Sequence, residues 1–173
     1  MSQRDSGYER KERDLYETPE WVTEALFPHI RKPNAILEPA CGTGKMLRVL
    51  MRFCDAVKGT DIEGGLDFLK FERPVHGAII TNPPYINAAD FISTALRLTK
   101  PTGGMVAMLL RTDFDHAKTR AVLFANHPAF AKKVVLTKRI KWFEDSKGQP
   151  SFNHAWFIWD WQHQGAPTLA YAP

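Results

Sequence analysis

The sequence predicts an α/β sandwich with a mainly parallel sheet. Short apolar runs with the length of strands alternate along the chain with segments whose apolar residues recur at helical spacing. A glycine-bearing turn joins the first of these strands to a helix, and polar residues follow the next two strands, as in parallel sheets that bind ligands. The chain has 173 residues, 44% of them hydrophobic, so we expect one core.

The elements begin after a polar stretch. Residues 1–15 are nearly all polar or charged, so we expect a mobile charged arm there and a single domain over 16–173. Thr18 and Pro19 predict a helix start, because a threonine hydroxyl caps free N–H groups and proline is tolerated at the first helical position. The apolar residues that follow recur at helical spacing, which predicts a helix over about 19–29.

The central part of the chain predicts the first strands of the sheet. An apolar run at 35–37 predicts a strand, and the amphipathic stretch at 46–54 predicts the helix that follows it. Residues 56–60 and 76–81 have the composition of further strands, and we expect a short one between them at 67–69. Strands and helices in this order indicate parallel connections.

The last part of the chain predicts a different connection. Helical spacing over 91–96 indicates another helix, and the continuous apolar run at 105–110 indicates a buried strand. Residues 133–137 and 152–159 also have the composition of strands, and no helix is predicted between them. We therefore expect these two strands to form an antiparallel pair.

Composition and charge exclude several classes of protein. The sequence has no run of about 18 apolar residues and no signal peptide, so we expect a cytoplasmic protein without membrane contact. Cys41 and Cys54 fit neither a disulfide framework nor a zinc pattern, and the six histidines lack metal-ligand spacing, so no metal is predicted. The net charge of +4 suits a polyanionic partner but is too small to predict one.

The stretch LEPACGTGK at 37–45 has the features of a nucleotide-like pocket. Gly42 and Gly44 permit a tight turn and a close approach of a ligand to the backbone. The third glycine of the dinucleotide fingerprint is missing, so a cofactor without a pyrophosphate is at least as compatible. Asp61 ends the next strand, where a carboxylate accepts hydrogen bonds from ribose hydroxyls, and Glu38 can face a positively charged group.

Two alternatives stay open for this stretch. The glycines also fit a plain strand-to-helix turn, and Asp61 also fits an ordinary polar strand end. Their order and spacing within one strand-helix-strand unit favour the pocket. Asp67 and Phe68 then predict an adenine site, with a carboxylate that accepts from an exocyclic amine beside a ring that packs on the base.

ITNPPYIN at 80–87 forms a stiff corner after a predicted strand. The two prolines have fixed φ angles, so the Asn82 side-chain oxygen and the Pro83 carbonyl become rigidly aimed acceptors. Two converging acceptors suit a planar NH₂ group whose lone pair is delocalised, because holding both hydrogens favours a more nucleophilic nitrogen. Tyr85 supplies a ring on which a flat substrate stacks. The alternative is a simple turn, because Asn-Pro often starts one.

Substrate contacts are expected from the second half of the chain. Arg111 ends a buried strand, from which it can reach a phosphate or pair with a local carboxylate. Of Phe152 and Trp156, Phe152 is the preferred ring for stacking on a target base, since Trp156 fits strand packing. Basic and aromatic residues also cluster in this part of the sequence. They fit nucleic-acid binding, or equally a solvated basic edge with aromatic residues over the core. These residues are Lys132, Lys133, Lys138, Arg139, Lys141, Trp142, Phe143 and Lys147.

Taken together, these motifs resemble the S-adenosylmethionine-dependent amino-methyltransferases, in particular the adenine-N6 DNA methyltransferases in which the cofactor motif precedes the catalytic one. EPACGTG resembles their cofactor loop, Asp61 their ribose-binding acid, DFL at 67–69 their adenine-site motif and NPPY at 82–85 their catalytic motif. YETPEWV at 16–22 is similar to their Thr-Pro segment beside the methionine end of the cofactor. FNHAWFIWDW at 152–161 resembles their late strand segment.

The resemblance implies a Rossmann-like seven-stranded sheet, mainly parallel with an antiparallel last strand and helices on both faces, and S-adenosylmethionine as cofactor. It implies a catalytic corner of Asn82, Pro83, Pro84 and Tyr85. Together with the positions of Arg111 and Phe152 described above, we expect substrate contacts from Tyr85, Arg111 and Phe152. The residues implied in cofactor binding are Tyr16, Thr18, Pro19, Glu38, Pro39, Ala40, Gly42, Gly44, Asp61, Ile62, Asp67, Phe68 and Asn82.

Two departures from the family pattern bear on these expectations. Met46 stands where the family often has phenylalanine after the cofactor loop. Only about a dozen residues follow Trp161, where the family usually continues into a target-recognition region, so the resemblance is to compact, phage-like forms. We expect DNA sequence discrimination to be weak, to come from loops, or to come from a protein partner or a second copy of the chain.

The expected function is methyl transfer from S-adenosylmethionine to the exocyclic amino group of adenine in DNA. Methylation of RNA adenine or guanine, or of a protein glutamine amide, presents the same planar NH₂ group to the corner. A protein substrate would gain least from the ring of Tyr85. A third alternative is an inactive methyltransferase-fold subunit that only binds, although Asn82, Asp61 and Gly42 are all present.

Overall fold

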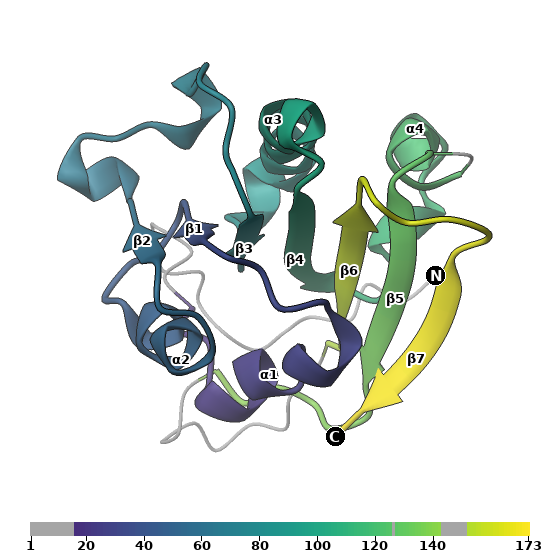
Figure 1. The fold of residues 1–173 in the computed structure, drawn as a ribbon. Coiled ribbons are helices and arrows are strands. Elements are labelled where there is room, and N and C mark those ends of the chain that lie inside the picture. Colours follow the sequence, from purple (N-terminus) through teal and green to yellow (C-terminus); the bar gives the residue numbers. More distant parts are fainter. Residues whose placement is uncertain (1–15, 126, 143–151) are drawn as a thin grey trace.

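The computed structural model describes residues 16–125, 127–142 and 152–173, and its centre is a seven-stranded sheet with the order β2-β1-β3-β4-β6-β5-β7 (Figure 1). Only β6 is reversed, because it is antiparallel to both β4 and β5, whereas all other neighbouring strands are parallel. The strands are β1 (Ile36–Glu38), β2 (Val57–Gly59), β3 (Ala78–Thr81), β4 (Met105–Arg111), β5 (Phe130–Leu136), β6 (His154–Asp160) and β7 (Thr168–Ala172).

The predicted fold class is confirmed, with one difference in the order of strands. The antiparallel pair expected at 133–137 and 152–159 forms as β5 and β6. The reversed strand is not the last one, because the chain continues into β7, which pairs in parallel with β5 and was not predicted. The expected arm at 1–15 lies outside the described residues.

Helices cover both faces of the sheet. Figure 1 shows α1 (Glu20–Glu24) and α2 (Lys45–Phe53) on one side, and α3 (Ala88–Thr99) and α4 (Ala121–Phe124) on the other. Successive side chains of β4 alternate between two apolar layers, one shared with α1 and α2 and the other with α3 and α4. Within the part of the chain that the structure describes, no helix is long and apolar enough to cross a membrane.

The N-terminal helix is shorter than predicted. It ends at Glu24, and a 3-10 turn, Phe27–His29, follows it, because Pro28 has no N–H to continue an α-helix. Thr18 does not cap the helix: its side chain is buried and makes no cap hydrogen bond, and Pro19 itself occupies the cap position. The helix therefore begins one residue later than the Thr-Pro pair indicated.

Residues 67–69 do not form the expected strand. Asp67 caps a 3-10 turn, Phe68–Lys70, by accepting a hydrogen bond from the Leu69 N–H at 3.1 Å. An aspartate that bonds to the backbone two residues ahead stabilises a turn in place of a strand. The connection from β2 to β3 consequently contains only this turn and a second one, Ile62–Gly64.

Candidate active site

A cavity of about 660 Å³ opens at the carboxyl ends of β1, β2 and β3. β1 lies between β2 and β3 in the sheet, so the strands that follow it lie on opposite sides. Open α/β sheets bind ligands at such a switch point. Most of the predicted cofactor residues line the cavity, namely Tyr16, Thr18, Glu38, Pro39, Ala40, Gly42, Asp61, Ile62, Asp67, Phe68 and Asn82.

Pro19 and Gly44 are not among the lining residues, contrary to expectation. Pro19 is the N-cap residue of α1, and Gly44 is the N-cap residue of α2. Gly44 has a φ angle of 81°, which lies in the left-handed region that favours glycine. Both residues shape the segments that border the cavity and do not contact its interior.

Hydrogen bonds tie the glycine loop, residues 39–44 between β1 and α2, to the residues after β2. The Gly42 N–H donates to Asp61 Oδ2 at 2.8 Å, and the Glu63 N–H donates to Asp61 Oδ1 at 3.1 Å. The Cys41 N–H donates to the Thr60 carbonyl at 3.0 Å. Because an ionised carboxylate offers about four acceptor positions, Asp61 is held in place and still has capacity for two hydroxyl donors from the cavity.

Glu38 is the most unusual group in the cavity. Its side chain is 2% exposed, and Oε2 has no hydrogen-bond partner among the described residues. Burial, and then the charge of Asp61, raise the pKa of Glu38 to about 8. A buried acceptor without a donor is costly, so the site favours a ligand that brings a cationic or N–H donor group to this carboxylate.

Apolar side chains form the wall of the cavity beyond Asp61. Ile62 and Leu66 line it and are 70% and 46% exposed, so a bound ring would remove apolar surface from water. Phe68 also lines the cavity but is only 2% exposed, because it packs against Phe91 with ring centroids 5.1 Å apart. The exposed pair therefore offers more surface to a ring than the predicted Phe68 does.

The corner after β3 carries a buried acceptor that lacks a hydrogen-bond partner among the described residues. The Asn82 amide donates from Nδ2 to the Tyr16 carbonyl at 3.3 Å, which fixes the orientation of the side chain. Asn82 Oδ1 is buried and has no hydrogen-bond partner within the described part of the chain. Pro84 lines the cavity, whereas Pro83 is buried and does not. Because Asn82 lines the cavity, a ligand there can supply the donor that this oxygen lacks.

The segment that carries Tyr16 closes one side of the cavity. Glu17 accepts a hydrogen bond from the Thr43 hydroxyl, so this segment is joined to the glycine loop. The same segment is also joined to the corner after β3, because the Asn82 amide donates to the Tyr16 carbonyl. The sequence placed Tyr16 near the cofactor only by resemblance, and it contained no signal for the contact with Asn82.

Tyr85 lies beside the cavity and does not line it. Its ring stacks on His154 of β6, with centroids 6.1 Å apart and an interplanar angle of 25°. His154 also meets Trp142 edge-on at 5.2 Å, and Trp142 lies 5.4 Å from the ring of Tyr16. Sequence reasoning missed His154, although it begins a strand that is buried along nearly its whole length.

His154 is a neutral ring in this cluster. Its side chain is 2% exposed, and burial, and then the charge of Arg111, lower its pKa to about 4. An uncharged imidazole stacks on a phenol ring without the cost of burying a cation. His154 consequently packs as an aromatic residue at neutral pH.

Arg111 and Phe152 lie together outside the cavity. The Arg111 guanidinium lies 4.2 Å from the centroid of the Phe152 ring. It also donates to both carboxylate oxygens of Asp113, at 3.1 and 2.8 Å, so the alternative of a local carboxylate partner is confirmed. Trp156 is fully buried and donates to the Val22 carbonyl at 2.8 Å, which leaves Phe152 as the ring available on this side.

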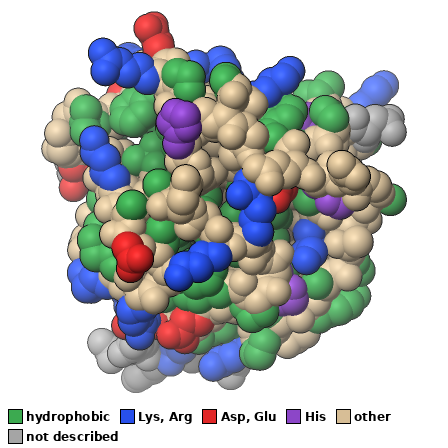
Figure 2. Space-filling model, in the orientation of Figure 1, with side chains coloured by type: hydrophobic (Ala, Val, Ile, Leu, Met, Phe, Trp, Pro, Cys, Tyr) green, Lys and Arg blue, Asp and Glu red, His purple; other side chains and the backbone are tan. Residues whose placement is uncertain are grey.

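The basic cluster expected from the sequence does not form a single patch. Lys132 and Lys133 are neighbours on β5, so their side chains lie on opposite faces of the sheet. Lys133 pairs with Asp115 at 2.8 Å, and Arg139 donates to Asn153 at 2.9 Å. Figure 2 shows Lys and Arg side chains spread over the visible face. Phe143 and Lys147 lie outside the described residues.

Comparison of the sequence with family models gives no match, and no curated protein matches it. Solved structures do match. The 23S rRNA methyltransferase ErmE is 18% identical over 80% of this chain, with a TM-score of 0.57. A dimethyladenosine transferase from Plasmodium falciparum is 17% identical over 84%, with a TM-score of 0.59. The M protein of the type I restriction enzyme EcoKI is 12% identical over 85%, also with 0.59.

These likenesses concern the fold. The chain spans 66%, 62% and 45% of the lengths of the three structures, so it covers less than two thirds of each. Identities of 12–18% are low enough for one fold to host different functions. The chain has the fold of methyltransferases, with its cavity at the switch point of that fold.

Proposed function

We propose that this protein transfers a methyl group from S-adenosylmethionine to the exocyclic amino group of adenine in DNA. The observation that carries the proposal is Asn82, which lines the cavity, donates its amide N–H to the Tyr16 carbonyl and has a buried oxygen without a partner among the described residues. A neutral acceptor fixed in this way suits an NH₂ group that becomes positively charged as it is methylated.

The residues of the cavity fit the cofactor. S-adenosylmethionine supplies an electrophilic methyl group on a sulfonium when it is bound. In our proposal Glu38 accepts from its amino group, which would give the orphaned Oε2 a donor. Asp61 accepts from the ribose hydroxyls, while Ile62 and Leu66 cover the adenine. Gly42 lets the backbone approach the ligand closely.

The corner residues act on the amine. In our proposal Asn82 Oδ1 accepts an N–H of the amine, which concentrates electron density on the nitrogen as the N–C bond forms and the S–C bond breaks. The extra proton then leaves to water, because an amide is too weak a base to take it. Tyr85, held by His154, supplies a ring for the extruded base.

Adenine and DNA are supported by different observations. The NPPY corner suits a planar NH₂ group such as that of adenine. Two of the matched structures are an rRNA methyltransferase and a dimethyladenosine transferase. The Thr-Pro segment at 16–22 resembles that of DNA methyltransferases, and another match is a restriction-enzyme M protein. RNA adenine is the second candidate because of the first two matches.

The test is transfer of an isotope-labelled methyl group to four substrates. Duplex DNA, single-stranded DNA, RNA and protein are each incubated with the full chain, with the Asn82→Ala variant as control. We expect label in DNA with wild type and a loss of at least about 100-fold with the variant. Label in RNA or protein alone would refute the DNA assignment, and cofactor binding without any transfer would favour an inactive subunit.

A further inference from the structure

The connection from β2 to β3 lacks the helix that the other crossovers have. α2, α3 and α4 lie in the connections after β1, β3 and β4, where their apolar residues pack on the sheet. Residues 60–77 form only two 3-10 turns in the corresponding place. Because helices normally cover both faces of a parallel sheet, the face of β1 and β2 on the α3 side lacks its usual cover.

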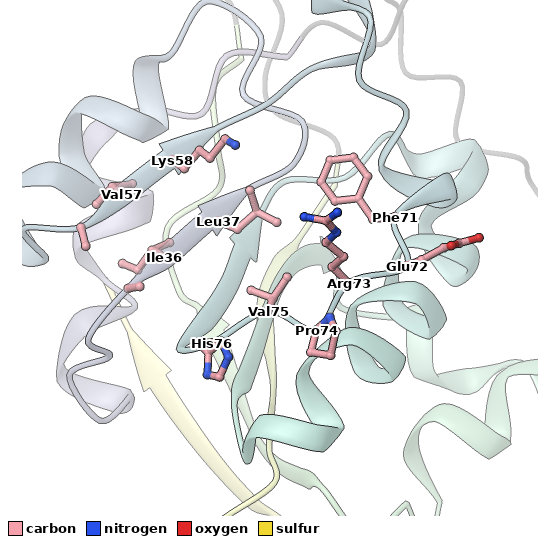
Figure 3. Close-up of a pocket in the computed structure, with 12 residues that line it drawn as sticks. Ile36, Leu37, Val57, Lys58, Phe71, Glu72, Arg73, Pro74, Val75 and His76 are labelled. Carbon is pink, nitrogen blue, oxygen red and sulfur yellow. The ribbon is translucent and has the colours of Figure 1, made fainter.

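A groove of about 670 Å³ lies in this place. Leu37 of β1 belongs to the apolar layer under α3 and lines the floor of the groove. Lys58 of β2 is in register with Leu37, so its side chain projects from the same face. Figure 3 shows Lys58 on one side of the groove and the segment 71–76 on the other. Its lining residues are all different from those of the candidate active site.

The wall formed by 71–76 is fixed to the rest of the fold. The Val75 N–H donates to the Leu98 carbonyl at 2.9 Å, and the Thr102 hydroxyl donates to the Val75 carbonyl at 2.7 Å. Arg97 of α3 donates to the Phe71 carbonyl at 2.7 Å. Both ends of the wall are thus anchored, and the groove between it and β2 is preformed.

The rim of the groove is predominantly basic. Lys58, Arg73 and His76 are exposed along it, against a single acidic residue, Glu72. Lys58 and Arg73 form no ion pair with any residue in the described ranges. Phe71 and Val75 add partly buried apolar surface between them. The combination of an apolar floor and unpaired cations is complementary to an occupant that is apolar on one side and acidic at its flanks.

We propose that this groove binds a helix of a partner protein, with an apolar stripe against Leu37, Phe71 and Val75 and acidic residues facing Lys58 and Arg73. A helix fits better than an added strand, because β2 has three residues and offers few edge groups for backbone pairing. A helix on this face also completes the layer that α3 begins.

A second copy of the chain fits the groove less well. Among the described helices, α1 has exposed acidic residues, but Glu20 and Glu24 both pair with Arg52, at 3.0 and 3.3 Å. The exposed apolar residue of α4, Val122, lies beside the basic residue Arg120. Within these described helices, charge complementarity therefore favours a different protein over a second copy.

The test uses the full chain and three fluorescently labelled synthetic helices. All three carry leucines at i, i+3, i+4 and i+7 spacing, flanked by Glu, Gln or Lys. Anisotropy titrations give the affinities for wild type, for the double variant Lys58→Glu/Arg73→Glu and for Lys118→Glu, which reverses an exposed lysine outside the groove. Thermal melts check that the variants, whose changes are on the surface, are folded.

We expect the Glu-flanked helix to bind wild type and Lys118→Glu with equal affinity. It should bind the double variant at least about tenfold more weakly. The Lys-flanked helix should bind the double variant more tightly than it binds wild type. Equal binding of the three helices to wild type, no binding of any, or no effect of the double reversal would overturn the proposal. It would also be overturned if wild type formed a dimer that the double reversal dissociated, because the groove would then serve a second copy.

Discussion

The two ends of the candidate active site use different acceptors. At the ends of β1 and β2 the acceptors are carboxylates, Glu38 and Asp61. After β3 the acceptor is the neutral amide of Asn82. Charged acceptors suit a ligand that keeps its donors throughout the reaction, whereas a neutral fixed acceptor suits an amine whose charge develops only in the transition state. In our account the two carboxylates bind the cofactor, and the Asn82 amide accelerates the methyl transfer.

The largest effect is expected from Asn82→Ala. The variant removes the acceptor that we assign to the transition state, so kcat should fall about 100- to 1,000-fold. Cofactor affinity should stay within about threefold of wild type, since the carboxylates remain. Single-turnover transfer and cofactor titration check both values. A loss of cofactor affinity equal to the loss of rate would contradict the division between the two ends.

Asp61→Ala should have the opposite pattern. It removes the proposed ribose acceptor and also the partner of the Gly42 N–H, so the cofactor Kd should rise about 10- to 100-fold. The rate at saturating cofactor should change by less than about threefold. Calorimetric titration compares Asp61→Ala with Asp61→Asn, which keeps the size of the side chain. Unchanged affinity in both variants would refute the ribose assignment.

Glu38 should make cofactor affinity depend on pH. Its pKa of about 8 means that the carboxylate is mostly protonated at pH 6 and must lose this proton to pair with a cationic amine. Affinity should therefore rise between pH 6 and 7.5, by up to about tenfold per pH unit, and stay nearly flat in Glu38→Gln. Titrations in buffers of different ionisation enthalpy measure the released proton, and its absence would contradict the assignment.

The same carboxyl group should lower the stability of the cofactor-free protein at high pH. The folded-state pKa of about 8 lies above the ordinary glutamate pKa of 4.5, so the folded state binds the extra proton and stability falls as pH rises from 4.5 to 8. Over this range the loss is on the order of a few kcal/mol. Glu38→Gln should be the more stable protein at pH 8, with no such decline in its melting temperature. Parallel declines in the two proteins would exclude Glu38 as the cause.

The smallest effect is expected from His154→Ala. Loss of the ring that stacks on Tyr85 should raise the KM for the nucleic acid about 3- to 10-fold, the equivalent of one aromatic contact. His154→Phe keeps a ring and should retain most of the affinity. Because the pKa of about 4 keeps His154 neutral, the ratio of wild type to variant should be constant between pH 6 and 8. A ratio that changes in this range would show that the histidine titrates.

The first end of the site was more predictable from sequence than the second. Gly42 and Asp61 are about twenty residues apart in a strand-helix-strand unit, and this local order brings them within hydrogen-bond distance. The sequence also predicted that Asn82 faces the same cavity, because both residues follow parallel strands. It contained no signal for the orphaned Glu38 oxygen, which depends on how neighbouring segments bury the side chain.

Long-range contacts account for most of what the sequence did not predict. β7 has only five residues, and it becomes a strand by pairing with β5, more than thirty residues earlier in the chain. The contacts of Tyr16 with Asn82 and of Tyr85 with His154 join segments 66 or more residues apart. The groove beside β2 exists because residues 60–77 do not form a helix. In the same segment Asp67 caps a 3-10 turn at the place where a strand was expected.

The most direct test of the account identifies the methylated atom. Duplex and single-stranded DNA are incubated with S-adenosylmethionine and the full chain, digested to nucleosides and examined by mass spectrometry, with Asn82→Ala alongside. We predict N6-methyladenine in the wild-type reaction and at least about 100-fold less with the variant. Methylation on a cytosine carbon, or equal yields of N6-methyladenine from the two proteins, would contradict the claim that the Asn82 corner activates an adenine amine.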